Sequence, residues 1–159
     1  MTTGNVPDGF DVGWKLVTEE FLEDLTPAQV RELATVHYHL LVVDDDPAIR
    51  KMLTLLLESA GYAVQTATDG SDALSVIEAG QPDLLLVDLQ MPGMGGLELL
   101  RRLSDLTVVP PSIVISGQLD GRSLAQDAGA AGFVSKPFDL DGLLDAVASA
   151  LNALSRTVP

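Results

Sequence analysis

Five polar side chains stand at the ends of short apolar runs: Asp44, Asp45, Asp88, Ser116 and Lys136. A carboxylate at the end of a buried strand is costly to desolvate, and three converging carboxylates raise one another's pKa unless a cation neutralises them. Oxygen ligands suit Mg²⁺, which keeps several waters and takes one or two carboxylates directly. A lysine offers a point charge for a dianion, and a serine hydroxyl can donate to its oxygens. These residue types predict a site that holds a phosphoryl group on or near Asp88.

Each of these residues also has a simpler interpretation, which the sequence leaves open for the residue taken alone. The run Asp44–Asp46 could be a capping cluster, since aspartate is common at helix starts. Lys136 could face solvent, Ser116 could belong to an ordinary turn, and Phe133 could be a core residue. The joint occurrence at strand ends favours the site. His37 and His39 lack the further ligands that a metal would need. No Gly-rich loop precedes a helix as in nucleotide-binding folds, so a tightly bound nucleotide is not expected as the phosphoryl source.

The elements that must position these residues alternate along the chain. Apolar runs predict strands over 40–43, 62–66, 83–87, 112–115 and 132–135. Capping residues and amphipathic spacing predict helices from Pro47 up to Gly61 and over 69–79, 97–103, 121–128 and 140–154. This alternation predicts an α/β fold, a doubly wound five-stranded parallel sheet covered by helices on both faces. Ligands of such sheets bind at the carboxyl ends of the strands, where the polar residues stand.

The first 37 residues do not share this alternation, so we expect three parts: an extension over 1–37, the α/β domain over 38–155 and a tail over 156–159. The extension is expected to begin disordered and to continue with two short helices. Its first helix carries an apolar stripe of Trp14, Val17, Phe21 and Leu25. That stripe must be buried, either on the same domain or in a homodimer formed through the extension. The second possibility is slightly favoured, because short helices are marginal alone and a two-fold interface buries both stripes.

Composition limits the function classes. The formal net charge of −14 opposes direct nucleic-acid binding, which needs a basic face. The chain has no cysteine, which excludes disulfides and thiolate chemistry and fits a reducing compartment. No apolar run approaches the roughly 20 residues that span a bilayer, and no secretory signal begins at Met1. We therefore expect a soluble, cytoplasmic protein that binds neither nucleic acid nor membrane.

The segment from His39 to Leu154, about three quarters of the chain, resembles the receiver domain of bacterial two-component response regulators (the CheY-like family). The resemblance is carried in order by Val43-Asp44-Asp45-Asp46, Asp88 with Met91-Pro92-Gly93, Ser116-Gly117, and Lys136-Pro137-Phe138. Each motif is short, but their joint occurrence at strand ends is specific. The resemblance implies the flavodoxin-like receiver fold for this segment, with the preceding residues as an N-terminal helical extension.

The resemblance also implies roles for individual residues. Asp88 would be the phosphoacceptor, taking a phosphoryl group from a sensor histidine kinase or a phosphotransfer protein. Mg²⁺ would be bound directly by Asp45, Asp88 and the backbone carbonyl of Gln90, with Asp44 acting mostly through water. The phosphoryl and switch residues would be Lys136, Ser116 and Phe133, and the peptide bond before Pro137 would be cis. Asp46 is better placed to cap the first helix. The chain departs from the family pattern at Gly117, where alanine is commoner, and carries Gln90 and Gln118 at positions that tune acyl-phosphate lifetime.

Three functions compete. We expect a phosphoprotein of a two-component phosphorelay that signals to a downstream effector protein by protein–protein interaction and has no DNA-binding output domain. It would not be an enzyme, beyond autophosphorylation from small phosphodonors and autodephosphorylation. The first alternative is an unphosphorylated pseudo-receiver scaffold, which the complete residue set disfavours. The second is a phosphatase with Asp88 as nucleophile, which would typically have a second aspartate where Gln90 stands.

Overall fold

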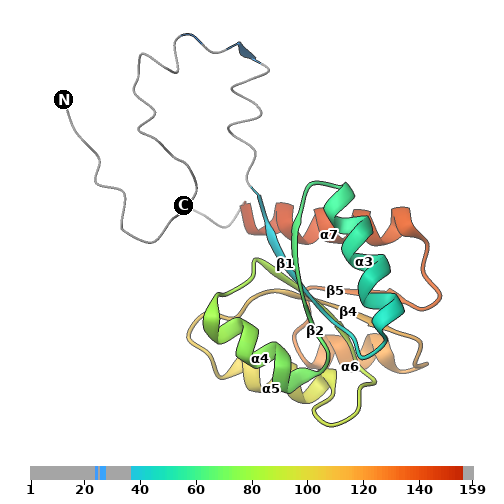
Figure 1. Cartoon of the computed structure of the whole chain (residues 1–159). Coiled ribbons are helices and arrows are strands. Elements are labelled where there is room, and N and C mark those ends of the chain that lie inside the picture. Colours follow the sequence, from blue (N-terminus) through green and yellow to red (C-terminus); the bar gives the residue numbers. More distant parts are fainter. Residues whose placement is uncertain (1–23, 25, 28–36, 156–159) are drawn as a thin grey trace. The chain divides into compact units, whose positions relative to one another are not determined.

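The computed structural model describes residues 24, 26, 27 and 37–155. The chain divides into two units, Met1–Val36 and His37–Pro159, and the second contains all the elements named below. Its strands are β1 (His39–Val43), β2 (Ala63–Ala67), β3 (Leu84–Asp88), β4 (Ser112–Ser116) and β5 (Gly132–Ser135). Its helices are α3 (Pro47–Ser59), α4 (Gly70–Ala79), α5 (Gly96–Ser104), α6 (Gly121–Asp127) and α7 (Leu140–Ser155) (Figure 1). None of the helices in this part of the chain is long and apolar enough to cross a membrane.

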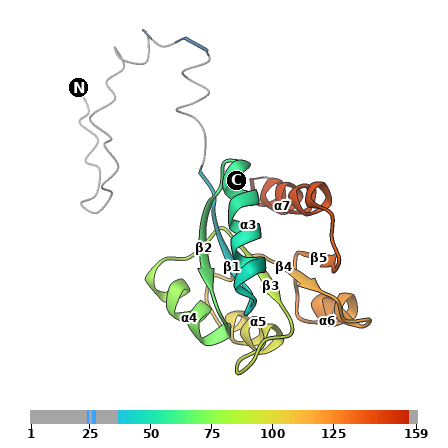
Figure 2. The same ribbon diagram turned by 45° about the vertical axis from the view of Figure 1, so that its right-hand side comes forward.

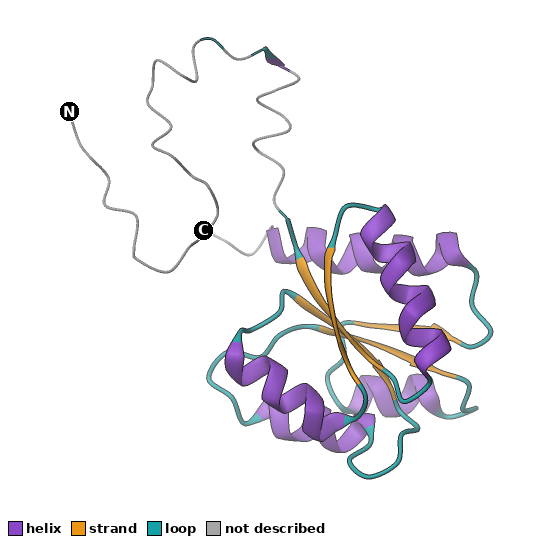
Figure 3. Ribbon diagram, in the orientation of Figure 1, coloured by secondary structure: helices purple, strands orange, loops and turns teal. Residues whose placement is uncertain are grey.

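The strands form one parallel sheet in the order β2-β1-β3-β4-β5. Figures 1 and 3 show the helices on both sides of this sheet. The fold class predicted from the sequence, a doubly wound five-stranded parallel sheet, is confirmed. The chain runs outward from β1 to β2 in one direction and from β3 to β5 in the other. The carboxyl ends of β1 and β3 therefore flank the point where strand order reverses, the usual ligand-binding crevice of such sheets.

The core explains why the strand sequences read as continuous apolar runs. Alternate residues of each inner strand enter opposite faces of the sheet, and both faces are covered. Leu40 and Val42 pack on the side of α3 and α7, whereas Leu41 and Val43 pack on the side of α4 and α5. Val114 joins a smaller cluster with α6. Full burial of each such side chain contributes about 1.5–3 kcal/mol relative to exposure, so the inner strands are strongly fixed.

Two helices begin at aspartate caps, of which the sequence predicted the first. Asp46 accepts a hydrogen bond from the backbone N–H of Ala48, with Pro47 as the first helical residue of α3. Asp69 caps α4 by accepting from the N–H of Asp72 at 2.8 Å. Such caps stabilise a helix by about 1 kcal/mol, because they satisfy backbone donors that have no partner inside the helix. The cap at Asp46 places Asp44 and Asp45 in the short loop before α3.

Several predicted boundaries are wrong by a residue or two. β2 runs from Ala63 to Ala67, not from residue 62 to 66, because a strand exposed at its middle lacks a clear apolar pattern. Asp83 lies before β3, where its carboxylate accepts a hydrogen bond from the N–H of His39 at 2.8 Å. Asp88 is the last residue of β3, not the first residue after it. The expected helices of residues 1–37 and the tail 156–159 lie outside the residues described here, save for single positions.

Gly96 allows α5 to start directly against the end of β3. Its N–H donates to the carbonyl of Leu89 at 3.3 Å. A Cβ at this position would collide with the backbone oxygen of Asp88 and lie 2.9 Å from Cγ1 of Val87. The close approach therefore requires a residue without a side chain, and it fixes the backbone that carries Asp88.

We predict that Gly96→Ala lowers the free energy of unfolding by about 1–3 kcal/mol, the usual cost of overpacking a tight contact. Gly80→Ala is the matched control, because a Cβ there meets nothing within 4 Å and the backbone is extended, with φ of −176°. The control should change stability by less than about 0.5 kcal/mol. Urea unfolding measures both variants, and equal effects of the two substitutions would contradict the steric argument.

Candidate functional site

Lys136 lies between two buried carboxylates at the carboxyl ends of the strands. Its Nζ is 3.2 Å from Oδ2 of Asp88 and 3.4 Å from Oδ2 of Asp44. The side chains of Asp44 and Asp88 are only 4% and 10% exposed, whereas that of Lys136 is 28% exposed. The register pairs Val43 with Val87, so Asp44 and Asp88 come to lie near each other across β1 and β3. Lys136 follows β5 and reaches them past the end of β4.

Backbone donors fix the other oxygen of each carboxylate. Oδ1 of Asp44 accepts from the N–H of Asp46 at 2.9 Å, and Oδ1 of Asp88 accepts from the N–H of Gln90 at 3.1 Å. In each case the carboxylate turns Oδ2 toward Lys136. Both acids are therefore held in a fixed orientation and share one cation as their partner, which reduces the cost of burying their charges.

Arg50 supports the loop that carries Asp44. Its Nη1 donates to the backbone carbonyl of Asp44 at 2.7 Å. This residue could not be predicted from the sequence, because its partner is a backbone oxygen six positions earlier and no motif marks such a contact. The guanidinium places a second cation beside the backbone of Asp44.

The three predicted carboxylates come together and could hold a divalent cation. Asp44, Asp45 and Asp88 each offer a carboxylate oxygen, and these oxygens lie within 4.8 Å of one another. Asp45 is exposed, whereas the other two are buried. A hard cation of the Mg²⁺ type binds few protein oxygens at 2.0–2.1 Å and keeps waters on its open side. Two buried acids with one exposed acid fit that requirement.

The local electrostatics favour a bound cation. Burial raises the pKa of Asp44, and the charge of Asp88 raises it further, although the hydrogen bond from Asp46 and the attraction of Lys136 oppose both effects. For Lys136, burial alone would lower the pKa, but the attraction of Asp44 and Asp88 and their hydrogen bonds raise it above its ordinary value. Lys136 therefore stays protonated, yet one ammonium does not fully compensate the cluster.

Ser116, at the end of β4, is 1% exposed and lies in the row of strand ends between Asp88 and Lys136. Its Oγ accepts a hydrogen bond from the N–H of Gln118 at 3.1 Å. Its backbone oxygen accepts from the N–H of Lys136 at 3.0 Å. The serine is thus tied to the residue that neutralises the acids, and the next peptide bond, Lys136–Pro137, is cis.

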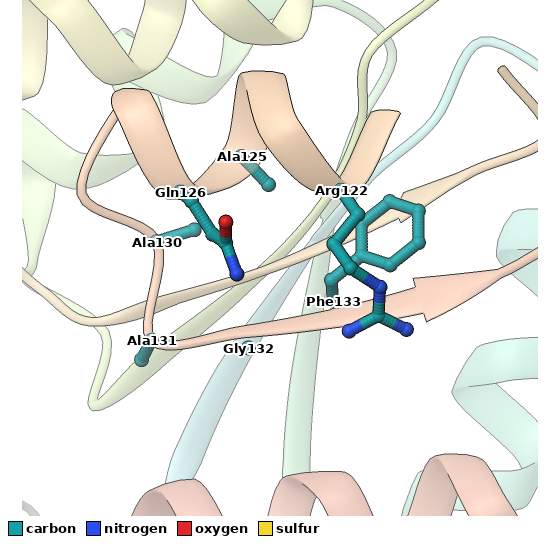
Figure 4. A pocket seen from close by; sticks show the side chains of 7 residues that line it. All are labelled: Arg122, Ala125, Gln126, Ala130, Ala131, Gly132 and Phe133. Carbon is teal, nitrogen blue, oxygen red and sulfur yellow. The ribbon is translucent and has the colours of Figure 1, made fainter. Parts of the chain in front are cut away.

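Phe133, on β5, is half-buried and packs against the cluster that includes Val114 and Ala125. The Cζ of Arg122 lies 5.0 Å from the centroid of its ring, a cation–π distance. A Cβ on Gly121 would lie 3.1 Å from the ring and 3.2 Å from Cβ of Ser116. Because Gly121 has no side chain, the space between Ser116 and Phe133 stays open. Figure 4 shows Phe133 and Arg122 at one end of a pocket of about 250 Å³.

Comparison with known proteins assigns the family. The model of the response regulator receiver domain matches residues 40–148. A response regulator receiver domain protein (CheY-like) from Methanospirillum hungatei is 30% identical, with a TM-score of 0.72 over 77% of this chain and 100% of that chain. A putative response regulator from Chloroflexus aurantiacus is 32% identical, with a TM-score of 0.71 over 74% of this chain and 99% of that chain. The chain belongs to the response regulator receiver domain family, whose members are signalling proteins.

Full-length relatives correct one expectation. The transcriptional regulatory protein CseB of Streptomyces avermitilis is 41% identical over 64% of this chain and 43% of its own length. The DNA-binding dual master transcriptional regulator RpaA of Synechocystis is 35% identical over 74% of this chain and 50% of its own length. The chain thus spans half or less of these relatives. The expectation of a receiver that signals without a DNA-binding output domain is wrong by this comparison. It rested on the short sequence after residue 154, which carries no information about output.

The raised pKa of Asp44 predicts a pH-dependent stability. Between the unfolded and folded pKa values the folded state holds more protons, so stability falls as pH rises through that interval. In metal-free buffer with EDTA, Asp44→Asn should therefore stabilise the protein at neutral pH, since asparagine keeps the oxygen that accepts from Asp46. The gain should shrink as pH falls toward the ordinary pKa of aspartate.

Urea unfolding across a pH series measures this effect. Asp127→Asn is the control, because Asp127 is exposed at the end of α6. A loss of stability in Asp44→Asn at neutral pH, or a gain that is independent of pH, would show that burial of this carboxylate does not dominate.

Proposed function

We propose that Asp88 is the phosphoacceptor of this receiver, taking a phosphoryl group from a histidine kinase or a phosphotransfer protein. The observation that supports it most directly is the position of the Lys136 ammonium within 3.4 Å of both Asp44 and Asp88. A carboxylate oxygen of Asp88 would attack the phosphorus, forming an O–P bond. The bond from phosphorus to the donor would break, and its electron pair would leave with the donor.

The surrounding residues would handle the charge of the transferred group. Lys136 would pair with the phosphoryl oxygens, which takes its charge away from Asp44. The Ser116 hydroxyl would give up its present contact with Gln118 and donate to a phosphoryl oxygen, and Phe133 would turn inward behind it. The residues placed to hold Mg²⁺ are Asp45, Asp88, the backbone carbonyl of Gln90 and, through water, Asp44. Bound there, Mg²⁺ would neutralise negative charge on the phosphoryl oxygens.

The chain would act as a phosphoacceptor and not as an enzyme on other substrates, apart from autophosphorylation by small donors and autodephosphorylation. Gln90 stands two residues after Asp88, where an amide cannot serve as a general acid. Phosphorylation would control a regulatory output of the kind named for the relatives, transcription. A homodimer through residues 1–37 and a cytoplasmic location stay predictions.

The first test uses acetyl phosphate with Mg²⁺. The wild-type chain should gain one base-labile, hydroxylamine-sensitive phosphoryl group, and Asp88→Asn should gain none, because an amide oxygen is too weak a nucleophile. Asp127→Asn is the matched control and should be labelled like the wild type. Intact-mass spectrometry reads the result, and label that persists in Asp88→Asn or resists hydroxylamine would refute acyl-phosphate formation.

The second test separates metal binding from the response to phosphorylation. Asp45→Ala should lose Mg²⁺ binding, whereas Lys136→Ala should keep it, since the carboxylates remain. With beryllofluoride and Mg²⁺, the amide resonances around Ser116 and Phe133 should shift in the wild type and in Lys51→Ala, an exposed-lysine control, but not in Lys136→Ala. If Lys136→Ala responds normally, the role given to this lysine is incorrect.

A further inference from the structure

β2 is an edge strand with one row of backbone groups directed away from the sheet. The N–H of Ala63 donates to Tyr38 and the carbonyl of Ala67 accepts from Asp44, so both residues direct these groups toward β1. The N–H and C=O groups of successive residues along a strand point alternately to its two sides. Val64 and Thr66 therefore present their N–H and C=O groups outward, on the side where no strand pairs with β2.

An open groove of about 570 Å³ runs along this free edge. β2 contributes Val64, Gln65 and Thr66 to it. The flanking helices α3 and α4, which lie on either side of β2 in Figures 1 and 2, contribute side chains that include Leu55 and Val76. Leu55, in the middle of α3, is 60% exposed. The groove thus joins free backbone groups to an uncovered apolar side chain.

The edge lacks the devices that normally prevent strand addition. Edge strands are usually protected by charged residues, proline, bulges or short length. β2 has five residues, Ala-Val-Gln-Thr-Ala, with no charge, proline or glycine. The opposite edge strand, β5, is shorter, contains Gly132 and runs directly into Lys136–Pro137. Of the two edges, β2 is the less protected against pairing with a further strand.

The charged residues that line the groove favour an acidic ligand. The chain carries a net charge of −14, yet the charged residues that line the groove are both cations, Arg50 and Lys51. A second copy that paired β2 with β2 would bring two such basic pairs together, which disfavours self-association there. An extended segment with carboxylates and alternate apolar side chains would pair with the backbone, cover Leu55 and neutralise Lys51.

We propose that the β2 edge groove binds an extended acidic segment of another protein by β-strand addition. This surface is separate from the acidic site, so the proposal does not depend on phosphorylation of Asp88. Arg50 nevertheless touches both places, since it lines the groove and donates to the carbonyl of Asp44.

The test uses a short, end-capped synthetic peptide that alternates valine and glutamate, added to the full chain. Isothermal titration should show binding, and NMR hydrogen exchange should show the amides of Val64 and Thr66, which have no partner in the free protein, becoming protected. The same peptide with lysine in place of glutamate should bind more weakly, and so should a version with N-methylated backbone amides.

Two protein variants complete the design. Lys51→Glu should weaken the binding of the glutamate peptide by roughly two- to tenfold, the range expected from losing and then reversing one exposed charge pair. Arg122→Glu on α6 should leave this binding unchanged. Thr66→Pro removes one outward N–H without touching the bonds to β1, and should weaken binding further. Equal binding of the glutamate and lysine peptides, unchanged binding of the N-methylated peptide, or protection confined to residues outside β2 would each overturn the proposal. No binding at high peptide concentration would also overturn it.

Discussion

The contact of one ammonium with two buried carboxylates is the constraint on which the site depends. Asp44 and Asp88 are almost fully buried, and two like charges at that depth are tolerable only with a cation held against both. Lys136 supplies that charge from a strand two places away from β3 in the sheet. Because the strands are parallel, these residues meet at the carboxyl ends of the strands. The order of the strands in the sheet therefore brings three distant segments of the chain together.

The same contact would change if a new anion were placed at Asp88. Lys136 is shared between two acids at 3.2 and 3.4 Å, and neither contact is short. A dianion at Asp88 would compete for the ammonium, and the raised pKa of Asp44 indicates that this carboxylate is already incompletely compensated. The backbone oxygen of Ser116 accepts a hydrogen bond from the N–H of Lys136. A Cβ on Gly121 would meet both Cβ of Ser116 and the ring of Phe133. Ser116 therefore lies next to the first residue of α6 and is hydrogen-bonded to the residue that follows β5.

The features that could be predicted from the sequence are those set by residues close together in the chain. Inner strands were found because both of their faces are apolar, and the cap at Asp46 was found because aspartate followed by proline and an apolar helical pattern is typical of a helix start. The meeting of the acidic residues and Lys136 was predicted because these residues follow recognisable strands. The start of β2 was missed because its middle is exposed, and Arg50 and Gly96 were missed because their contacts are with backbone atoms of other segments. Neither composition nor the few residues after α7 could indicate the output that relatives carry.

The first turns of α3 join two surfaces that would otherwise be independent. Pro47 begins the helix, and Asp46 before it both caps it and donates to Asp44. One turn later, Arg50 bonds the Asp44 carbonyl on one side and lines the groove along β2 on the other. A carboxylate that draws the guanidinium into the groove would weaken its hold on the loop of Asp44, because charge-assisted contacts compete for the same donors. Occupation of the groove would therefore act on the loop of Asp44 through a single side chain, Arg50.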